Sequence, residues 1–360
     1  MKTRVATKPP DPGKTFSMAQ RVAVALSGGA DSALAAHMLL EEGFDVFALH
    51  AVFSRSPHTE GHSNAALAVA TLLGIQLHTV DLSREFAYHV IDPFCTEYAE
   101  GRTPNPCVRC NAAIKFGALL AEARRLGADL MATGHYARTE DSVEGTRLLR
   151  GVDHRADQSY FLYRVGHNAL ARTVMPLGRM MRADVHTRIS GLGLPISRPS
   201  ADLCFINDRS YHSFVAARVG AQPGPVVDSS RRVLGKHRGL PFYTVGQRHG
   251  LKLSLGYPAY VTAIRPEENQ LVVGPEHELY AGSAIITDLA WIAGHAPSHR
   301  FSSEVRVRYR ARAVAADIEV LGTTAHVKFH EPQKAVAPGQ SLVVYNGETV
   351  LGGGILKAAW

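Results

Sequence analysis

The strongest sign of the fold class lies at residues 22–32, which read VAVALSGGADS. The first five residues form a short, continuous apolar run, which is typical of a strand buried in a parallel sheet. A helical pattern follows, with Leu34, Met38 and Leu39 on one face and Gly43 as a stop signal. The turn SGGADS therefore joins a buried strand to a helix, and the amino end of a helix is where anions bind.

The same alternation continues outward from this segment. We expect strands at 45–49, 75–80 and 129–132, and helices at 64–73 and 112–126. Strands that alternate with helices over 22–132 predict an α/β domain, Rossmann-like, with a mostly parallel sheet.

The pattern changes after about residue 205, where short runs are punctuated by glycine and proline. Residues 260–265 and 270–273 flank PEEN, which predicts a hairpin. Strands dominate from residue 285, at 305–311, 318–321, 325–329 and 341–345. We expect a disordered basic tail (1–18), a catalytic domain (19–205), a small central linker domain (206–280) and a C-terminal β-barrel (281–360).

Composition sets limits on function. The 360 residues are 46% hydrophobic and 20% charged, which excludes collagen, coiled coils and wholesale disorder. No run approaches the ~20 apolar residues of a membrane helix. The net charge of +7 permits a polyanionic partner. Four cysteines are too few for a disulfide scaffold, so we expect a cytoplasmic protein whose thiols are used chemically.

The turn after the first strand has the parts of a phosphate loop. Gly28 and Gly29 let backbone N–H groups approach a polyphosphate, and Ser27 and Ser32 add hydroxyl donors. Asp31 cannot bind phosphate directly, but it can hold Mg²⁺ that bridges the phosphates. There is no Walker lysine. The alternative is an ordinary capped turn; the six residues resemble the signature of the PP-loop ATP pyrophosphatases, which adenylate a carbonyl oxygen.

A second motif, GRTPNPCVRCN at 101–111, precedes a predicted helix. We expect Cys110 near the helix N-terminus, where the dipole and Arg109 lower the pKa of a thiol. The alternatives are a pair of structural cysteines or a zinc knuckle, although no second C-x-x-C completes such a site. Cys204 alone would be a core cysteine, and Cys95 is taken as structural.

Seven ordered blocks together resemble the tRNA-specific 2-thiouridylase family, from about Arg21 to Leu356. They are SGGADS (27–32), GRTPNPCVRCN (101–111), ATGHYAR (132–138), DQSYFL (157–162), LCFI (203–206), TVGQRHGL (244–251) and LGGGI (351–355). The family converts the wobble uridine of certain tRNAs to 2-thiouridine with ATP and a protein persulfide. The resemblance thus implies ATP, Mg²⁺, tRNA and a sulfur donor, such as a cysteine desulfurase or a sulfur-relay protein.

The resemblance also implies roles for individual residues. Cys110 matches the catalytic nucleophile, and Cys204 matches the cysteine that carries the persulfide. The ATP contacts match Ala25, Leu26, Ser27, Gly28, Gly29, Ala30, Asp31, Ser32, Ala51 and Gly134. The tRNA contacts match Asn105, Pro106, Cys107, His135, Ala156, Asp157, Gln158, Arg308, Tyr309 and Gln340.

Three departures from the family pattern stand out. Residues 50–54, HAVFS, replace a segment with acidic residues; Cys107 replaces a common Asp; and residues 201–202, Ala-Asp, replace Thr-Gly. The third thiol leaves two routes open. Cys110 can attack a Cys204 persulfide and leave a disulfide, or Cys107, Cys110 and Cys204 can hold a [4Fe-4S] cluster.

Residues 305–312 read VRVRYRAR and offer an independent sign of RNA binding. On a strand, Arg306, Arg308, Arg310 and Arg312 would share one face, which suits a phosphate backbone; the alternative is a solvated barrel face. Two other functions remain open at this point. One is a PP-loop synthetase for a small molecule, and the other is a catalytically inert tRNA-binding homologue.

Overall fold

The computed structural model describes residues 20–54, 57–197, 203–206 and 211–360. The predicted tail at 1–18 lies outside these residues. None of the helices in the described ranges is both long and apolar enough to cross a membrane.

The N-terminal part is built on a five-stranded parallel sheet in the order β3-β2-β1-β4-β7. Its strands are β1 (Arg21–Ala25), β2 (Asp45–Val52), β3 (Leu77–Asp81), β4 (Leu130–Ala132) and β7 (Thr173–Val174). The central residues of β1 are fully buried, as the apolar run predicts. The α/β fold is therefore confirmed.

Helices cover this sheet, and several bounds differ from those predicted. They include α1 (Ala30–Glu41), α2 (Pro57–Leu73), α3 (Ser83–Phe86), α4 (Asp92–Ala99), α5 (Pro106–Arg109), α6 (Leu120–Arg125), α7 (His167–Ala171), α8 (Arg182–Leu192) and α9 (Tyr211–Val219). Two π-helices, η1 (Ala87–Ile91) and η2 (Cys110–Leu119), continue α3 and α5. The helix predicted from residue 112 thus begins six residues earlier, at Pro106, because a proline suits a first helical position.

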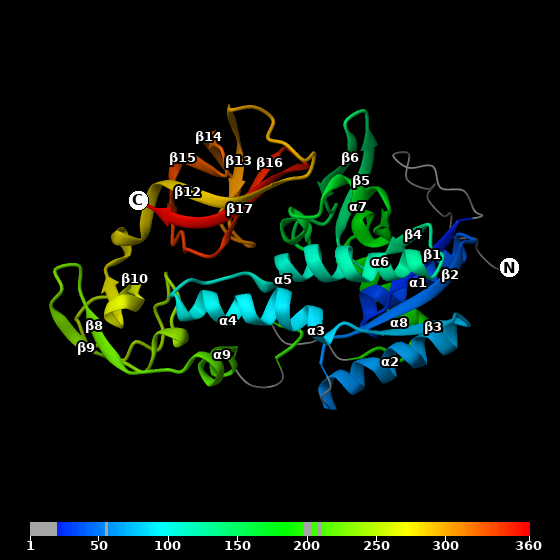
Figure 1. The fold of residues 1–360 in the computed structure, drawn as a ribbon, viewed down its shortest axis with the longest axis horizontal. Helices are drawn as coiled ribbons and strands as arrows, with labels where there is room; N and C mark the ends of the chain where they lie inside the picture. Colours follow the sequence, from blue (N-terminus) through cyan, green and yellow to red (C-terminus); the bar gives the residue numbers. More distant parts are fainter. Residues whose placement is uncertain (1–19, 55–56, 198–202, 207–210) are drawn as a thin grey trace.

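The middle of the chain forms a small sheet in the order β10-β11-β8-β9. Its strands are β8 (Gly224–Val227), β9 (Val233–His237), β10 (Tyr260–Arg265) and β11 (Gln270–Gly274). Strands β10 and β11 are antiparallel and joined through a 3-10 turn at Pro266–Glu268, so the predicted hairpin is confirmed. Figure 1 places this sheet beside α9.

The C-terminal part is a six-stranded barrel that closes between β12 and β17. It comprises β12 (Tyr280–Trp291), β13 (Arg300–Arg306), β14 (Val314–Leu321), β15 (Thr324–Lys334), β16 (Ser341–Asn346) and β17 (Thr349–Ala359). The motif LGGGI (351–355) lies on β17, which pairs with β16 on one side and with β12 on the other. A Cβ on Gly353 would lie 2.2 Å from the Leu342 carbonyl oxygen, so only glycine fits at this closure.

One prediction for the barrel is wrong. Strand β13 ends at Arg306, and residues 307–311 form bends and a turn. The four arginines therefore do not share a strand face. Arg306 is largely buried against the N-terminal domain, whereas Arg308, Arg310 and Arg312 are exposed beyond the strand.

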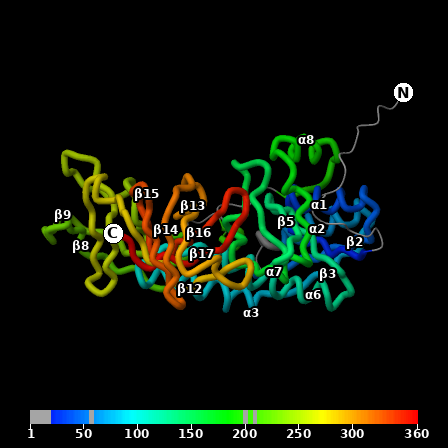
Figure 2. Tube along the Cα trace, turned by 90° about the horizontal axis from the view of Figure 1, so that it is seen from above, coloured from blue at the N-terminus to red at the C-terminus, as the bar shows by residue number. Residues whose placement is uncertain are grey.

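The barrel is joined to the N-terminal domain by a hairpin that sequence analysis missed. Strands β5 (Ala137–Ser142) and β6 (Gly145–Arg150) extend the barrel sheet, because β6 pairs with β17. Side chains from both parts also share one apolar core, in which Leu148 and Tyr160 meet Val343 and Tyr345. In Figure 2 the barrel lies between the parallel sheet at one end and the small middle sheet at the other.

Candidate active site

The phosphate loop lies where the order of the parallel sheet reverses. Strand β1 has β2 on one side and β4 on the other, and ligands of open α/β sheets bind at the carboxyl ends of such strands. The loops after β1 and β4 come very close there. A Cβ on Gly134 would lie 2.7 Å from the Asp31 carbonyl carbon. Glycine at 134 therefore permits the loop after β4 to contact the start of α1.

Two hydroxyl groups shape the phosphate loop itself. The Ser32 hydroxyl donates to the Gly29 carbonyl oxygen (3.0 Å) and accepts the Ser27 N–H (3.1 Å). The two serine hydroxyls lie 3.0 Å apart. Gly28 has φ of +82°, and a Cβ there would lie 2.6 Å from the His62 carbonyl oxygen. The second glycine of the sequence motif, Gly29, caps α1 without a side-chain bond, so the helix N-terminus stays open.

Asp31 lies in the first turn of α1, directly after this loop. The Tyr136 hydroxyl donates to its Oδ1 at 2.9 Å, and Tyr136 is almost fully buried. Burial and the Asp31 carboxylate raise the pKa of Tyr136, so the phenol keeps its proton. The carboxylate is thereby oriented while its second oxygen has no bond to a described residue.

The end of β2 carries a histidine where the resemblance implied acidic residues. His50 there is buried, and its ring nitrogens lie 2.9 Å from the Leu26 carbonyl oxygen and 2.9 Å from the Ser63 hydroxyl. Burial lowers the pKa of His50, so the ring is neutral at pH 7. His50 thus ties α2 to the strand before the phosphate loop. Ala51, predicted to contact ATP, follows it and is half-buried.

The cysteine motif forms the start of one long helix. Cys107 lies in α5, and Cys110 is buried at the first residue of η2. Cys95 is buried and packs in a separate apolar cluster on α4. All four cysteines are free thiols. The placement of Cys110 in the first turns of a helix is as expected.

The expected lowering of the Cys110 pKa is wrong for the free protein. Burial is the largest cause, and it raises the pKa of Cys107 to about 11 and that of Cys110 to about 12. The cation that opposes the shift is Lys115, not Arg109. Both thiols are therefore protonated at pH 7 in this structure.

Cys204 lies in the short described segment 203–206. The residue is exposed, although the protein packed around its sulfur raises the pKa of the thiol. A negative charge on Cys204 also raises the pKa of Cys107 and that of Cys110. The fold thus places three thiols, up to 97 positions apart in the sequence, within electrostatic range of one another. Within the described ranges, no three His, Cys, Asp or Glu side chains lie close enough to hold a metal ion.

Sequence analysis missed Lys115. Its Nζ lies 3.5 Å from Nε2 of His135, whose Nδ1 lies 2.8 Å from the Thr133 hydroxyl. Burial and the Lys115 charge hold the pKa of His135 well below its usual range, so the imidazole is neutral. The available signal was the spacing of five from Cys110, but that spacing is informative only once the helix is known to be π-helical.

The approach to the cysteines is fastened to the barrel. The Thr103 N–H donates to the Pro338 carbonyl oxygen (2.8 Å), and the Gln340 side chain donates to the Thr103 carbonyl oxygen (2.7 Å). Asn105 precedes the buried Pro106, and it lines a small pocket together with Arg109 and Arg164. Gln340, predicted to contact tRNA, therefore positions the Asn-Pro segment in this structure.

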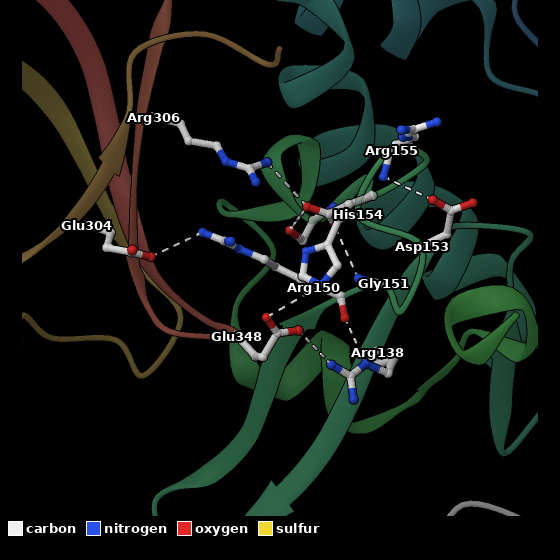
Figure 3. A network of polar contacts seen from close by, with 11 residues as sticks. Arg138, Arg150, Gly151, Asp153, His154, Arg155, Glu304, Arg306 and Glu348 are labelled. Atoms are coloured by element: carbon white, nitrogen blue, oxygen red, sulfur yellow. Dashed lines mark hydrogen bonds and ion pairs between the residues drawn. The ribbon is translucent and has the colours of Figure 1, made fainter. Parts of the chain in front are cut away.

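The second predicted tRNA segment is largely internal. Ala156 and Asp157 are buried, and Asp157 accepts hydrogen bonds from the Gly151 and Ser159 N–H groups. The Gln158 side chain accepts the Tyr136 N–H at 3.0 Å. Figure 3 shows the preceding loop residues Gly151, Asp153 and Arg155 on the side of Glu304 and Arg306 of the barrel. The segment thus connects the barrel to the residue that orients Asp31.

Besides Gln340, the two other predicted barrel contacts, Arg308 and Tyr309, lie in the turn after β13. Arg308 is exposed and donates to the Lys334 carbonyl oxygen at 3.1 Å. The Tyr309 ring lies 4.3 Å from that of Phe161, so it reaches across to the N-terminal domain. Burial and the charge of Asp157, which lies within electrostatic range, raise the pKa of Tyr309.

The fold and the phosphate loop define a nucleotide-binding α/β protein with an appended barrel, and comparison with known families agrees. Residues 20–208 match the tRNA methyl transferase HUP domain, and residues 212–275 match the tRNA methyl transferase PRC-barrel domain. Residues 282–356 match the Aminomethyltransferase beta-barrel domain.

The particular family follows from individual relatives. A tRNA-specific 2-thiouridylase MnmA of Dehalococcoides mccartyi is 41% identical over 344 residues, which cover 93% of this chain and 96% of the relative. The protein of the same name from Acidithiobacillus ferrooxidans is 42% identical over 346 residues, with 94% and 98% coverage. The chain belongs to the tRNA-specific 2-thiouridylase family.

Solved structures resemble the chain only loosely. The U34-tRNA thiolase NcsA from Methanococcus maripaludis, with its [4Fe-4S] cluster, covers 55% of this chain at 18% identity and a TM-score of 0.36. The match spans 63% of that protein.

Proposed function

We propose that this protein makes 2-thiouridine at the wobble position of tRNA. The observation that carries the proposal is the combination of a phosphate loop and three thiols within electrostatic range of one another, in a chain related over nearly its whole length to tRNA-specific 2-thiouridylases. A small-molecule PP-loop synthetase has no need of the thiols. An inert homologue has no need of an Asp31 carboxylate oriented by a buried phenol.

The first chemical problem is that the C2 oxygen of uracil is a poor leaving group. ATP solves it: the C2 oxygen attacks the α-phosphorus, pyrophosphate departs, and the N3 proton passes to solvent. The loop N–H groups and the start of α1 would bind the β- and γ-phosphates. Mg²⁺ held by Asp31 through the phosphates would supply charge neutralisation.

The second step replaces the activated oxygen by sulfur. Cys204 would receive a persulfide from a sulfur donor, and the Cys110 thiolate would attack the inner sulfur. The terminal sulfur then leaves with its electron pair, attacks C2 and displaces AMP. A Cys110–Cys204 disulfide remains, and an external thiol reductant must reduce it before the next turnover. Because Cys110 is protonated in the free protein, its activation must accompany substrate binding.

We favour this persulfide route over the cluster route. In the described residues Cys107, Cys110 and Cys204 share electrostatic surroundings but do not form a metal-binding trio, so this arrangement does not fit a [4Fe-4S] cluster. Cys107 is then a neighbour of the target base and not a ligand.

The test is mass spectrometry of nucleosides from tRNA incubated with the protein, ATP, Mg²⁺ and a persulfide donor. We expect 2-thiouridine at the wobble position and one AMP for each sulfur transferred. Pyrophosphate release without tRNA would favour a small-molecule synthetase, and tRNA binding without turnover would favour the inert homologue.

A further inference from the structure

Lys115 lies between the two halves of the site. On one side its Nζ contacts His135, which directly follows the Gly134 that lies against Asp31. On the other side its charge acts on all three thiols of the sulfur site. Lys115 is thereby linked to the phosphate loop through His135 and Gly134 and to the sulfur site through its charge.

The helix geometry explains why a lysine five residues after Cys110 lies on this side. In a π-helix each N–H bonds the carbonyl five residues earlier, so residues five apart are neighbours along the axis. In an α-helix of 3.6 residues per turn, Lys115 would be rotated away from Cys110. The π-helix η2 begins at Cys110 and therefore places Lys115 one turn beyond it.

Lys115 lacks an anionic partner. Its one polar contact to a described residue is His135, which is neutral, and no carboxylate among the described residues pairs with it. An ammonium group has three donor hydrogens, so at least two remain available. A half-buried cation without a counter-charge beside a phosphate loop is arranged to receive an anion.

We propose that Lys115 is a catalytic residue that contacts the α-phosphoryl group of ATP during adenylation of uracil, an inference that rests on the function proposed above. As the bond from the uracil C2 oxygen to the α-phosphorus forms, the bond from phosphorus to the pyrophosphate oxygen breaks, and its electron pair leaves with pyrophosphate. Negative charge on the α-phosphoryl oxygens is then stabilised by the ammonium group. The same contact holds AMP after sulfur transfer.

Binding provides a test that does not depend on turnover. Isothermal titration with AMP and with adenosine isolates the contribution of the phosphate. For the wild type we expect AMP to bind at least tenfold more tightly than adenosine. In Lys115→Met the two affinities should approach each other within about twofold, while adenosine binding is unchanged. If Lys115→Met keeps the full preference for AMP, the proposal is wrong.

A rate measurement identifies the step. We expect Lys115→Met to slow single-turnover, tRNA-dependent pyrophosphate release by about 100-fold, the usual effect of removing one charge-stabilising group. Lys115→Arg should recover part of the rate. Lys357→Met, which removes an exposed lysine on β17, is the matched control and should behave as wild type. Circular dichroism melting of each variant verifies the fold.

Two other outcomes are informative. Normal pyrophosphate release with loss of 2-thiouridine in Lys115→Met would assign the lysine to sulfur transfer and overturn the proposal. If the wild type itself released no pyrophosphate with tRNA, the proposed function would fail. The comparison of AMP with adenosine would still test the phosphate contact on its own.

Discussion

Arg306 of the barrel and Asp157 of the nucleotide-binding domain form an ion pair, with 3.5 Å between the guanidinium Nη1 and the carboxylate Oδ2 (Figure 3). The Asp157 side chain is fully buried, and 12% of the Arg306 side chain is exposed. The pair joins the end of β13 to the segment that orients Tyr136. Two predicted tRNA-binding segments, 156–158 and 308–309, are therefore fixed relative to each other.

Removing the two partners should have unequal effects on stability. Asp157→Asn should lower the free energy of unfolding by about 3 kcal/mol, because it leaves Arg306 without its buried partner. Arg306→Met should cost less, about 1–2 kcal/mol, since Asp157 retains three hydrogen bonds from Gly151 and Ser159. Urea unfolding curves for both variants and the double variant measure the coupling. Equal effects of the two substitutions would contradict this asymmetry.

Asp31→Ala should abolish AMP formation while tRNA affinity stays within about twofold. The reason is that Asp31 lies at the phosphate loop and not on the surface that would receive RNA. Thin-layer chromatography of labelled ATP and a filter-binding assay measure the two properties. Asp45→Ala, at the opposite end of β2, serves as the control. AMP production that survives in Asp31→Ala would refute the assignment of this loop.

Arg308→Ala combined with Arg310→Ala should weaken tRNA binding and flatten its dependence on salt. Both side chains are exposed in the turn after β13, where they can reach phosphates. The slope of log K against log salt should fall by roughly one per lost contact. Arg300→Ala, at the exposed start of the same strand, should leave the slope unchanged. A salt dependence identical to wild type would mean that the turn is merely solvated.

Cys107→Ser should thiolate tRNA within about twofold of the wild-type rate in the absence of iron. The persulfide route requires only Cys110 and Cys204, so serine at either of those positions should abolish product. Cys95→Ser, in a separate cluster, should have no effect. Should Cys107→Ser lose activity together with an iron-dependent visible absorbance of the wild type, the cluster route would be the correct one.

Stability should fall as the pH drops below about 6.5. His135 is held neutral by burial and by Lys115, so its pKa in the folded state is well below that of the unfolded chain, about 6.5. Below that pH the His135 imidazole binds a proton in the unfolded state but not in the folded state, so acid favours unfolding. Unfolding free energies of His135→Gln between pH 5 and 8 should vary less than those of the wild type. The exposed His277→Gln should keep the wild-type dependence.

Local signals in the sequence predicted the parallel sheet and the phosphate loop. The conformations of VAVAL and SGGADS are set by residues adjacent in the chain, so the sequence alone was sufficient for these two segments. The end of β13 could not be predicted this way. The alternation of apolar and basic residues continues through VRVRYRAR. The strand nevertheless ends at Arg306, which forms an ion pair with Asp157, a residue far away in the sequence. Lys115 was hidden for a related reason, since the spacing from Cys110 has meaning only in a π-helix. The raised pKa of Cys110 depends on burial that only the tertiary structure supplies.

The pairing of β6 with β17 has a consequence during synthesis on the ribosome. Thr349 pairs with Leu149, so roughly 200 residues must be translated before β6 meets its partner. At about 5–20 residues per second this takes about 10–40 s. Throughout that interval one edge of the β5–β6 hairpin is unpaired, and unpaired strand edges recruit other chains. The nascent protein is therefore prone to aggregate until β17 has emerged from the ribosome. We expect chaperones to bind the exposed edge of the hairpin during that interval.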